Sequence, residues 1–165
     1  MPIVSGDIEY RLSGGAANSD PNASLGGAKS STLAGANLYD NVDSAEAAAG
    51  DVEYRCYYVH NDHATLTMLS AKAWIQANTP SGDSVLAIGL GTSAVNGTEQ
   101  TVAGEGNAPS GVTFVAAPDE ANAIALGDIP AGQHKAVWTR RTITAAAAAY
   151  SADTATLRAK CDTLA

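Results

Sequence analysis

The chain has few charged and few aromatic residues for its 165-residue length. Charged residues make up 16% of it, against roughly 25% in an average domain, and aromatic residues make up 5%. Nine Lys and Arg stand against 17 Asp and Glu, which gives a net charge of −8. A protein that binds nucleic acid or an anionic membrane needs a basic face to neutralise phosphates. We therefore expect neither as a partner.

Long apolar runs are also missing. The alanine run at 145–149 is far shorter than the ~18 apolar residues of a membrane-spanning helix. The opening residues, MPIVSGDIEYRL, lack the basic and apolar regions of a secretory leader. The expectation is a soluble chain made in the cytoplasm.

Cysteine is scarce, with only Cys56 and Cys161 in the chain. They lie too far apart in sequence for a CxxC redox motif, and two cysteines are too few for a zinc site. Both fall on the apolar face of a predicted strand. Three hypotheses stay open: free buried thiols, a disulfide within the chain, or a disulfide between chains through Cys161, which lies near the C-terminus.

The first fifty residues are rich in Gly, Asn and Ser, which favour turns and loops. We predict an irregular arm over 1–50 that becomes ordered on a neighbouring subunit, with one short strand near 7–12. We also expect that removing residues 1–37 leaves the rest of the chain folded. A short helical turn is predicted from Asp43, an N-cap residue, through Glu46 to Gly50, which ends it.

From Asp51 onward, apolar and polar residues alternate with a period of two, which indicates half-buried strands. Hardly any helical pattern lies between these strands, so a parallel α/β fold is excluded. We predict an all-β antiparallel sandwich over 51–165, Ig-like or jelly-roll-like. Trp74 and Trp138 are expected to fill the space between its two sheets. The predicted strands lie at 51–58, 64–75 (with a bulge), 85–90, 101–103, 112–116, 124–126, 134–143 and 154–162.

Motifs for catalysis and for metal or phosphate binding are missing from the sequence. There is no Gly-x-Ser-x-Gly elbow, no phosphate-binding loop and no calcium-loop pattern. His60, Asp62, His63 and His134 offer metal-ligand atoms, but we interpret 60–63 as a polar turn between strands. The sequence therefore predicts a protein that is not an enzyme, with no catalytic residue, metal or cofactor.

Surface contacts are predicted for one strand. Lys135, Arg140 and Arg141 lie on it, and they form a basic patch with Arg158 and Lys160 if the two strands pair. Such a patch docks on an acidic partner, although the solvated face of an outer sheet explains the same pattern. Tyr57, on the polar face of its strand, is a further candidate for partner contact.

Four segments of the chain, 7–15, 20–27, 51–61 and 126–142, resemble small virion structural proteins of tailed bacteriophages, of the neck, collar or capsid decoration type. The resemblance implies a non-enzymatic component on the outside of the particle, assembled in the host cytoplasm, that binds other virion proteins at a repeated site on the head or connector. We expect a homo-oligomer, with a trimer as the first choice. The alternative is an Ig-like module that recognises a host surface glycan or protein through the loops 60–63 and 96–110.

Overall fold

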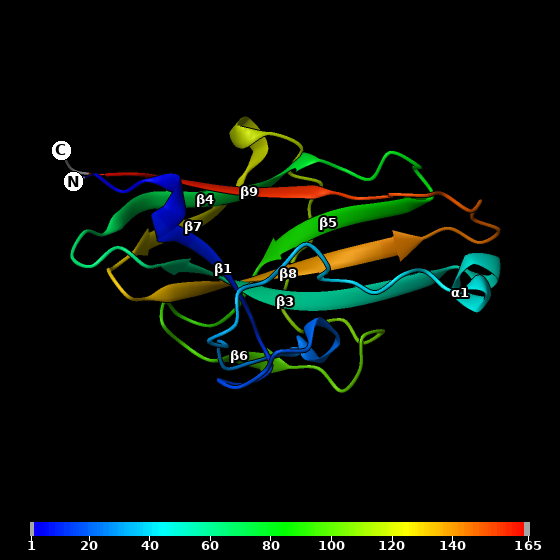
Figure 1. The fold of residues 1–165 in the computed structure, drawn as a ribbon, viewed down its shortest axis with the longest axis horizontal. Helices are drawn as coiled ribbons and strands as arrows, with labels where there is room; N and C mark the ends of the chain where they lie inside the picture. The colour runs from blue at the N-terminus through cyan, green and yellow to red at the C-terminus, as the bar shows by residue number, and fades with distance from the viewer. Residues whose placement is uncertain (1, 164–165) are drawn as a thin grey trace.

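Two antiparallel sheets pack face to face, as the sequence predicted, and a small third layer covers the outer face of the larger sheet (Figure 1). The computed structural model describes residues 2–163. The four-stranded sheet has the order β1-β3-β8-β5 and the three-stranded sheet the order β7-β4-β9, while β2 and β6 form the third layer. The strands are β1 (Ile8–Leu12), β2 (Gly26–Gly27), β3 (Asp51–Asn61), β4 (Met68–Ala77), β5 (Ser84–Leu90), β6 (Glu99–Thr101), β7 (Ile124–Ile129), β8 (His134–Ile143) and β9 (Thr156–Asp162).

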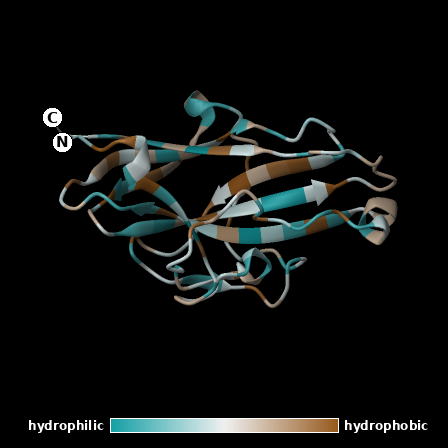
Figure 2. Cartoon of the chain, viewed as in Figure 1, coloured by the Kyte–Doolittle hydropathy of each residue, from teal (hydrophilic) through white to brown (hydrophobic). Residues whose placement is uncertain are grey.

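The main core lies between the two larger sheets. Alternate residues of β3, β8 and β5 point into it, among them Tyr57, Val137 and Ile88. The three-stranded sheet contributes Met68 and Ile75, among others. Figure 2 shows β5 as mostly hydrophobic, whereas the C-terminal part of β8 is hydrophilic. The polar side chains at the C-terminal end of β8 therefore need hydrogen-bond or ion-pair partners within the protein.

A second core lies on the outer face of the four-stranded sheet, beneath the third layer. Cys56, Tyr58 and Trp138 are buried in it against Val102. Strand β3 is thus buried on both faces. The predicted outward position of Tyr57 is wrong for this reason. Trp138 is buried as expected but lies in this outer core.

Trp74 is partly buried against the main core. It alternates with the buried Ala73 and Ile75 on β4, so its side chain points to the outer face of the three-stranded sheet, and the prediction that both tryptophans fill the space between the sheets is wrong.

Residues 2–50 differ from the predicted irregular arm, because they are built into the sandwich. Strand β1 pairs with β3 from Ile8↔Asn61 to Leu12↔Tyr57. Ser13 is fully buried, and its hydroxyl donates to the carbonyl of Cys56 (2.9 Å). Removing 1–37 would expose the edge of β3 and part of both cores, so these contacts argue against the expectation that the remainder stays folded. The predicted arm, 1–50, includes residue 1, and the predicted sandwich, 51–165, includes residues 164 and 165. These three residues lie outside the described residues.

Helix α1 (Ser44–Ala49) confirms the predicted helical turn. Asp43 accepts hydrogen bonds from the N–H groups of Ala45 (2.7 Å) and Glu46 (2.9 Å), and Gly50 ends the helix with a positive φ of 76°. Three short 3-10 helices complete the secondary structure: η1 (Ser5–Asp7), η2 (Pro21–Ala23) and η3 (Glu120–Asn122). Within residues 2–163, no helix has the length and apolar character needed to cross a membrane.

Two irregular features of the strands bear on the predictions. The predicted bulge in β4 is confirmed, because its register to β7 and to β9 shifts near Ser70, which has a positive φ of 49°. The strand predicted at 112–116 is reduced to one bridge between Val115 and Ile88.

Candidate functional site

The sandwich is closed along one side and open along the other. On the closed side, Val115 and Ile88 exchange two backbone hydrogen bonds (2.9 Å each), and the N–H of Ile75 donates to the carbonyl of Ala117 (2.8 Å). The segment 115–117 therefore joins β5 of one sheet to β4 of the other. On the open side, Figure 1 shows that β3, β8 and β5 extend further toward α1 than β9 does. Part of the inner face of the four-stranded sheet is left without a facing strand.

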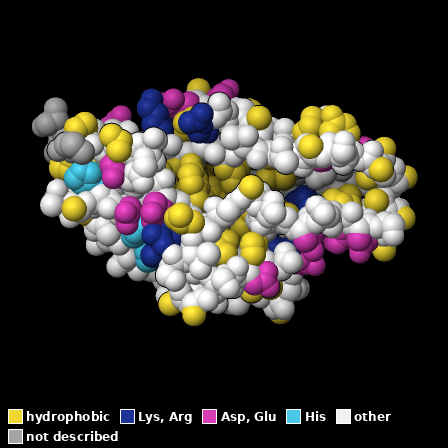
Figure 3. Space-filling model, in the orientation of Figure 1, with side chains coloured by type: hydrophobic (Ala, Val, Ile, Leu, Met, Phe, Trp, Pro, Cys, Tyr) yellow, Lys and Arg dark blue, Asp and Glu magenta, His cyan; other side chains and the backbone are white. Residues whose placement is uncertain are grey.

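A groove of about 1150 Å³ lies over this uncovered part of the sheet. Its floor includes Tyr57, Leu86 and Ile143, and its walls are the segments 34–44 and 146–157. Figure 3 shows the hollow in the centre of the molecule, with hydrophobic side chains visible at its bottom. Tyr57, Leu86 and Ile143 are themselves buried, at 1%, 8% and 3% exposure, so the main core stays covered at the bottom of this groove. We call this groove the edge groove.

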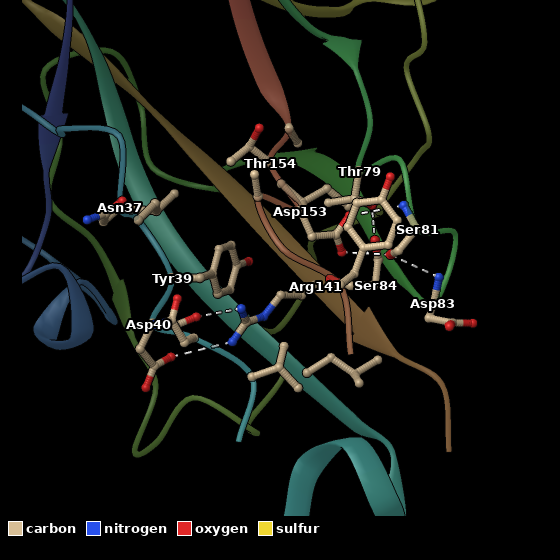
Figure 4. A pocket seen from close by; sticks show the side chains of 18 of the residues that line it. Asn37, Tyr39, Asp40, Thr79, Ser81, Asp83, Ser84, Arg141, Asp153 and Thr154 are labelled. Carbon is tan, nitrogen blue, oxygen red and sulfur yellow. Dashed lines mark hydrogen bonds and ion pairs between the residues drawn. The ribbon is translucent and has the colours of Figure 1, made fainter. Parts of the chain in front are cut away.

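The charged residues lining the edge groove are four aspartates, Asp40, Asp43, Asp83 and Asp153, and one arginine, Arg141. The aspartates are held in place by hydrogen bonds. Asp153 accepts from the backbone N–H (3.0 Å) and the hydroxyl (2.7 Å) of Ser81, and Asp83 accepts from the N–H of Ala148 (3.2 Å). Figure 4 shows Asp40, Asp83 and Asp153 around the groove. The rim is therefore acidic and fixed in position.

Tyr57 contributes a polar atom to the apolar floor. Its side chain is 1% exposed, and its hydroxyl has no hydrogen-bond partner among residues 2–163. Burial raises the pKa of this phenol well above its ordinary value, so the hydroxyl stays protonated. An unpartnered buried hydroxyl costs about 1–3 kcal/mol.

A buried ionic network fixes one wall of the groove. Arg141 donates through Nε to Oε2 of Glu53 and through Nη1 to the carbonyl of Asp40 (2.7 Å). Arg55, whose side chain is fully buried, pairs with Glu105. The ring of Tyr39 lies 4.7 Å from Cζ of Arg141 and 5.4 Å from Cζ of Arg55. Through these contacts with Tyr39, both guanidinium groups hold the wall segment 34–44 against the four-stranded sheet.

The hydroxyl of Tyr39 adds a hydrogen bond between the wall segment and the sheet, because it donates to Oγ1 of Thr139 (2.8 Å). Burial raises the pKa of Tyr39 above its ordinary value, which keeps this donor protonated.

The predicted basic patch does not form, because β8 and β9 belong to different sheets. Lys135 is buried, and its ammonium donates to the carbonyl of Ser93. Arg140 lies with its Cζ 5.4 Å from the ring of Phe114. Arg141 belongs to the network just described. These three residues hold the protein together and offer no common docking surface.

The two residues expected to join the patch from β9 are engaged elsewhere. Lys160 pairs with Glu120 (2.9 Å), and Arg158 donates to the side-chain oxygen of Gln76.

The two cysteines are free thiols on different sides of the four-stranded sheet. Cys56 is fully buried in the outer core, whereas Cys161 is partly buried against the main core. Burial raises the pKa of both thiols. The hypothesis of a disulfide within the chain is therefore wrong for this structure. A disulfide between chains through Cys161 stays a prediction.

The prediction of a polar turn over 60–63 is only half right, because His60 and Asn61 are buried residues of strand β3 and the turn begins after them. Nδ1 of His63 accepts from the N–H groups of Thr65 (3.1 Å) and Leu66 (3.0 Å). Nδ1 of His60 contacts the carbonyl of Gln133 (3.1 Å), and burial lowers the pKa of this imidazole. The rings of His60 and His134 lie 6.4 Å apart.

Comparisons with protein-family models, with curated proteins and with solved structures find no match to this chain. A function therefore has to be inferred from its own residues and surfaces. The surface that stands out, the edge groove, was missed at the level of sequence. Its walls consist of Gly, Ala, Asn and Ser segments whose position depends on contacts distant in sequence.

Proposed function

We propose that the protein is a non-enzymatic structural subunit on the exterior of a tailed bacteriophage particle. It attaches there to neighbouring virion proteins through the edge groove. The observation that carries this proposal is the groove itself, an acidic-rimmed depression over the inner face of the four-stranded sheet with Leu86 and Ile143 among its lining residues. The resemblance of four segments to phage virion proteins supplies the kind of assembly. The head, the connector and the neck are the candidate attachment sites.

The groove favours one kind of occupant, an extended apolar segment of a neighbouring subunit with Lys or Arg beside it. Its floor is the inner face of a sheet, so alternate side chains of an extended segment would pack on Leu86 and Ile143. The four aspartates on the rim would attract and orient basic residues.

A subunit of this kind works by mass action. Each copy bound to a repeated site stabilises the assembled form over the separate subunits. Charge complementarity at the rim makes attachment sensitive to salt, because exposed charges are screened within about 8 Å at physiological ionic strength. A homo-oligomer, with a trimer as first choice, stays part of the proposal.

The experiment is immunogold labelling of purified particles of the phage that encodes the chain, viewed by electron microscopy. Label over the head supports decoration, and label at the head–tail junction supports a neck or collar subunit. Particles that carry no label overturn the virion role.

A pair of variants tests the groove. Ala148→Trp fills the groove, and Ala121→Trp places the same side chain at an exposed site outside it. We expect A148W to fold with an unchanged Tm and to be lost from particles, while A121W is incorporated normally. Full incorporation of A148W would remove the groove as the attachment site while leaving the virion role standing.

A further inference from the structure

Two histidines lie opposite each other on the outer face of the four-stranded sheet. His60 of β3 and His134 of β8 are register partners, and the centroids of their rings lie 6.4 Å apart. Each stands two residues from a member of the outer core, Tyr58 or Ala136, and residues two apart on a strand share a face. The pair therefore borders the outer core, on the side of the sheet that the third layer covers.

Both imidazoles are enclosed by the protein. His60 is 7% exposed, and its Nδ1 contacts the carbonyl of Gln133 (3.1 Å). Nδ1 of His134 is buried and has no hydrogen-bond partner within residues 2–163. Because burying a charge costs far more than burying a neutral polar group, burial lowers the pKa of both imidazoles, that of His134 to about 4.

The cations near the pair also oppose its protonation. Lys29, in the segment that follows β2, lowers the pKa of both imidazoles, and Arg11 of β1 lowers that of His60. Lys29 forms no ion pair in the described part of the chain. Two charged imidazoles would therefore repel each other and the segment that carries Lys29.

Groups that favour protonation act mainly on His60. Oδ1 of Asp62 lies 3.7 Å from Nε2 of His60, and Glu9 raises the pKa of the same imidazole. For His134, only a hydrogen bond with the backbone of Gly97 acts in this direction. Both pKa values are lowered despite these groups, so the uncharged pair is the form that fits the closed structure.

Two further charged groups nearby have roles of their own. Lys135 follows His134 directly, so its side chain points to the other face of the sheet. The carboxylate of Glu99, on β6, accepts from Thr92 and from the N–H of Ser93, and its pKa of about 2 keeps it charged above pH 4. Neither group changes its charge between pH 7 and pH 5.

Tyr58 connects the histidine pair to the third layer. Its ring lies 4.8 Å from that of His134, with the two planes at 90°. Its hydroxyl donates to the carbonyl of Gly27 on β2 (2.5 Å) and accepts from the N–H of Glu99 on β6 (3.0 Å). One side chain thus holds both strands of the layer, and it packs directly on His134.

We propose that the His60–His134 pair is an acid-sensitive switch of the third layer. Uncharged imidazoles let the layer close over the outer core, whereas protonation drives Lys29 and the layer away from the sheet. A histidine whose pKa is lower in the closed form than in the open form takes up protons on opening. The closed form is therefore favoured above the ordinary histidine pKa of about 6.5 and is weakened as the pH falls toward 4.

Opening would uncover the outer core, including Trp138 and Val102. The switch lies on the opposite face of the four-stranded sheet from the edge groove, and it does not depend on the proposed virion role.

The test is amide hydrogen exchange of the full-length chain by NMR, corrected for the intrinsic effect of pH on exchange. The N–H groups of Glu99 and Val102 report on the layer, because they donate to the hydroxyl of Tyr58 and to the carbonyl of Leu25. We expect their opening constant to rise about tenfold between pH 7 and pH 5. The N–H of Ile75, which lies in the other sheet, should keep its protection.

Two variants and a control assign the response to the pair. His134→Phe keeps a ring beside Tyr58 but cannot be protonated, and it should remove most of the rise. Lys29→Met removes the cation that opposes both imidazoles and should reduce the rise. His63→Gln changes the chain's third histidine, in the turn after β3, and should respond as the parent does.

Circular dichroism at pH 7 checks that each variant is folded, and K29M decides the test if H134F is not. The proposal is overturned if Glu99 and Val102 are equally protected at pH 5 and pH 7 in the parent. It is also overturned if the folded variants keep the parent's full rise, since other groups would then cause it. Parallel loss of protection at Ile75 would overturn it too, because the whole chain would then be unfolding.

Discussion

Glu53 and Arg141 face each other across the β3–β8 pair and form an ion pair inside the molecule. Glu53 is fully buried and the side chain of Arg141 is 7% exposed. The same guanidinium donates to the carbonyl of Asp40, which lies on a wall of the edge groove. One buried pair therefore fixes both the register of two central strands and the position of the groove wall.

Arg141→Met should destabilise the protein strongly. The substitution keeps much of the side-chain volume but leaves Glu53 buried without its cation, which typically costs 3–5 kcal/mol. Urea unfolding at pH 7 measures the loss. Arg158→Met on the exposed face of β9 is the control, with an expected change within about 0.5 kcal/mol. Equal losses in the two variants would show that the Glu53–Arg141 pair contributes no more than a surface contact.

The loss in Arg141→Met should depend on pH in a defined direction. Burial raises the pKa of Glu53 above its ordinary value even with Arg141 present, and the variant raises it further. A carboxyl whose folded pKa lies above its unfolded pKa destabilises the fold as pH rises between the two values. The gap in unfolding free energy between parent and variant should therefore widen from pH 4.5 to pH 7.5. A difference in unfolding free energy that stays constant with pH would show that Glu53 is not the group whose ion pair is lost.

Glu99 should show the opposite pH dependence. Burial opposes its charged form, but hydrogen bonds from the N–H of Ser93 (2.9 Å) and from Oγ1 of Thr92 (2.9 Å) outweigh it and lower the pKa to about 2. Its stabilisation is complete above the unfolded pKa and is lost as pH falls toward 2.

Glu99→Gln should remove this dependence. Comparison of urea unfolding at pH 6 and pH 2.5 should show the gap between parent and variant shrinking by about 1–2 kcal/mol at the lower pH, with solvent screening allowed for. A gap that stays constant or grows at low pH contradicts the assignment.

The two thiols should differ in reactivity toward a disulfide reagent such as DTNB. Cys56 is fully buried, and burial raises its pKa, so it should react only after unfolding. Cys161 is partly exposed and should react slowly in the folded protein. We expect one thiol in the native chain and two in guanidinium chloride, with Cys161→Ser removing the native reaction. Fewer than two thiols in the denatured, unreduced chain would reveal a disulfide.

The alternation of apolar residues was enough to predict most of the strands. It failed to predict how β3 is buried, because a period of two assigns one buried face and β3 has two. The consecutive residues 56–59, Cys-Tyr-Tyr-Val, are the local signal for a strand covered on both sides. What covers the outer face is β2 with β6, two segments more than seventy residues apart whose pairing leaves no local pattern.

The prediction that the charged residues of β8 lie at the surface was wrong for a related reason. Arginine and lysine in a strand usually mark a solvated face, so Lys135 and Arg141 were predicted at the surface. Their burial depends on Glu53 and on the carbonyl of Ser93, partners that are 88 and 42 residues away in sequence. The edge groove was not predicted because the position of its walls depends on long-range contacts of the same kind. The capping pattern from Asp43 to Glu46, by contrast, is local and was predicted correctly.

The docking of the third layer depends on Gly26, and a matched pair of substitutions isolates that dependence. Gly26 and Gly82 both have positive φ, 93° and 73°. Replacement by Ala therefore strains the backbone at either position by about 1–2 kcal/mol. A Cβ on Gly26 would lie 1.8 Å from the carbonyl oxygen of Gln100, whereas a Cβ on Gly82 meets nothing within 4 Å among the described residues.

Gly26→Ala should therefore lose at least about 2 kcal/mol more than Gly82→Ala, because β2 can no longer approach β6 and the outer core opens. The measurement is urea unfolding of both variants, followed by the fluorescence of Trp138, which that layer buries. A red-shifted native spectrum in G26A alone is the expected sign that the layer has lifted. Equal losses with an unchanged spectrum would mean that the layer shifts to accept a methyl group, and that its contact with β6 contributes little to the fold.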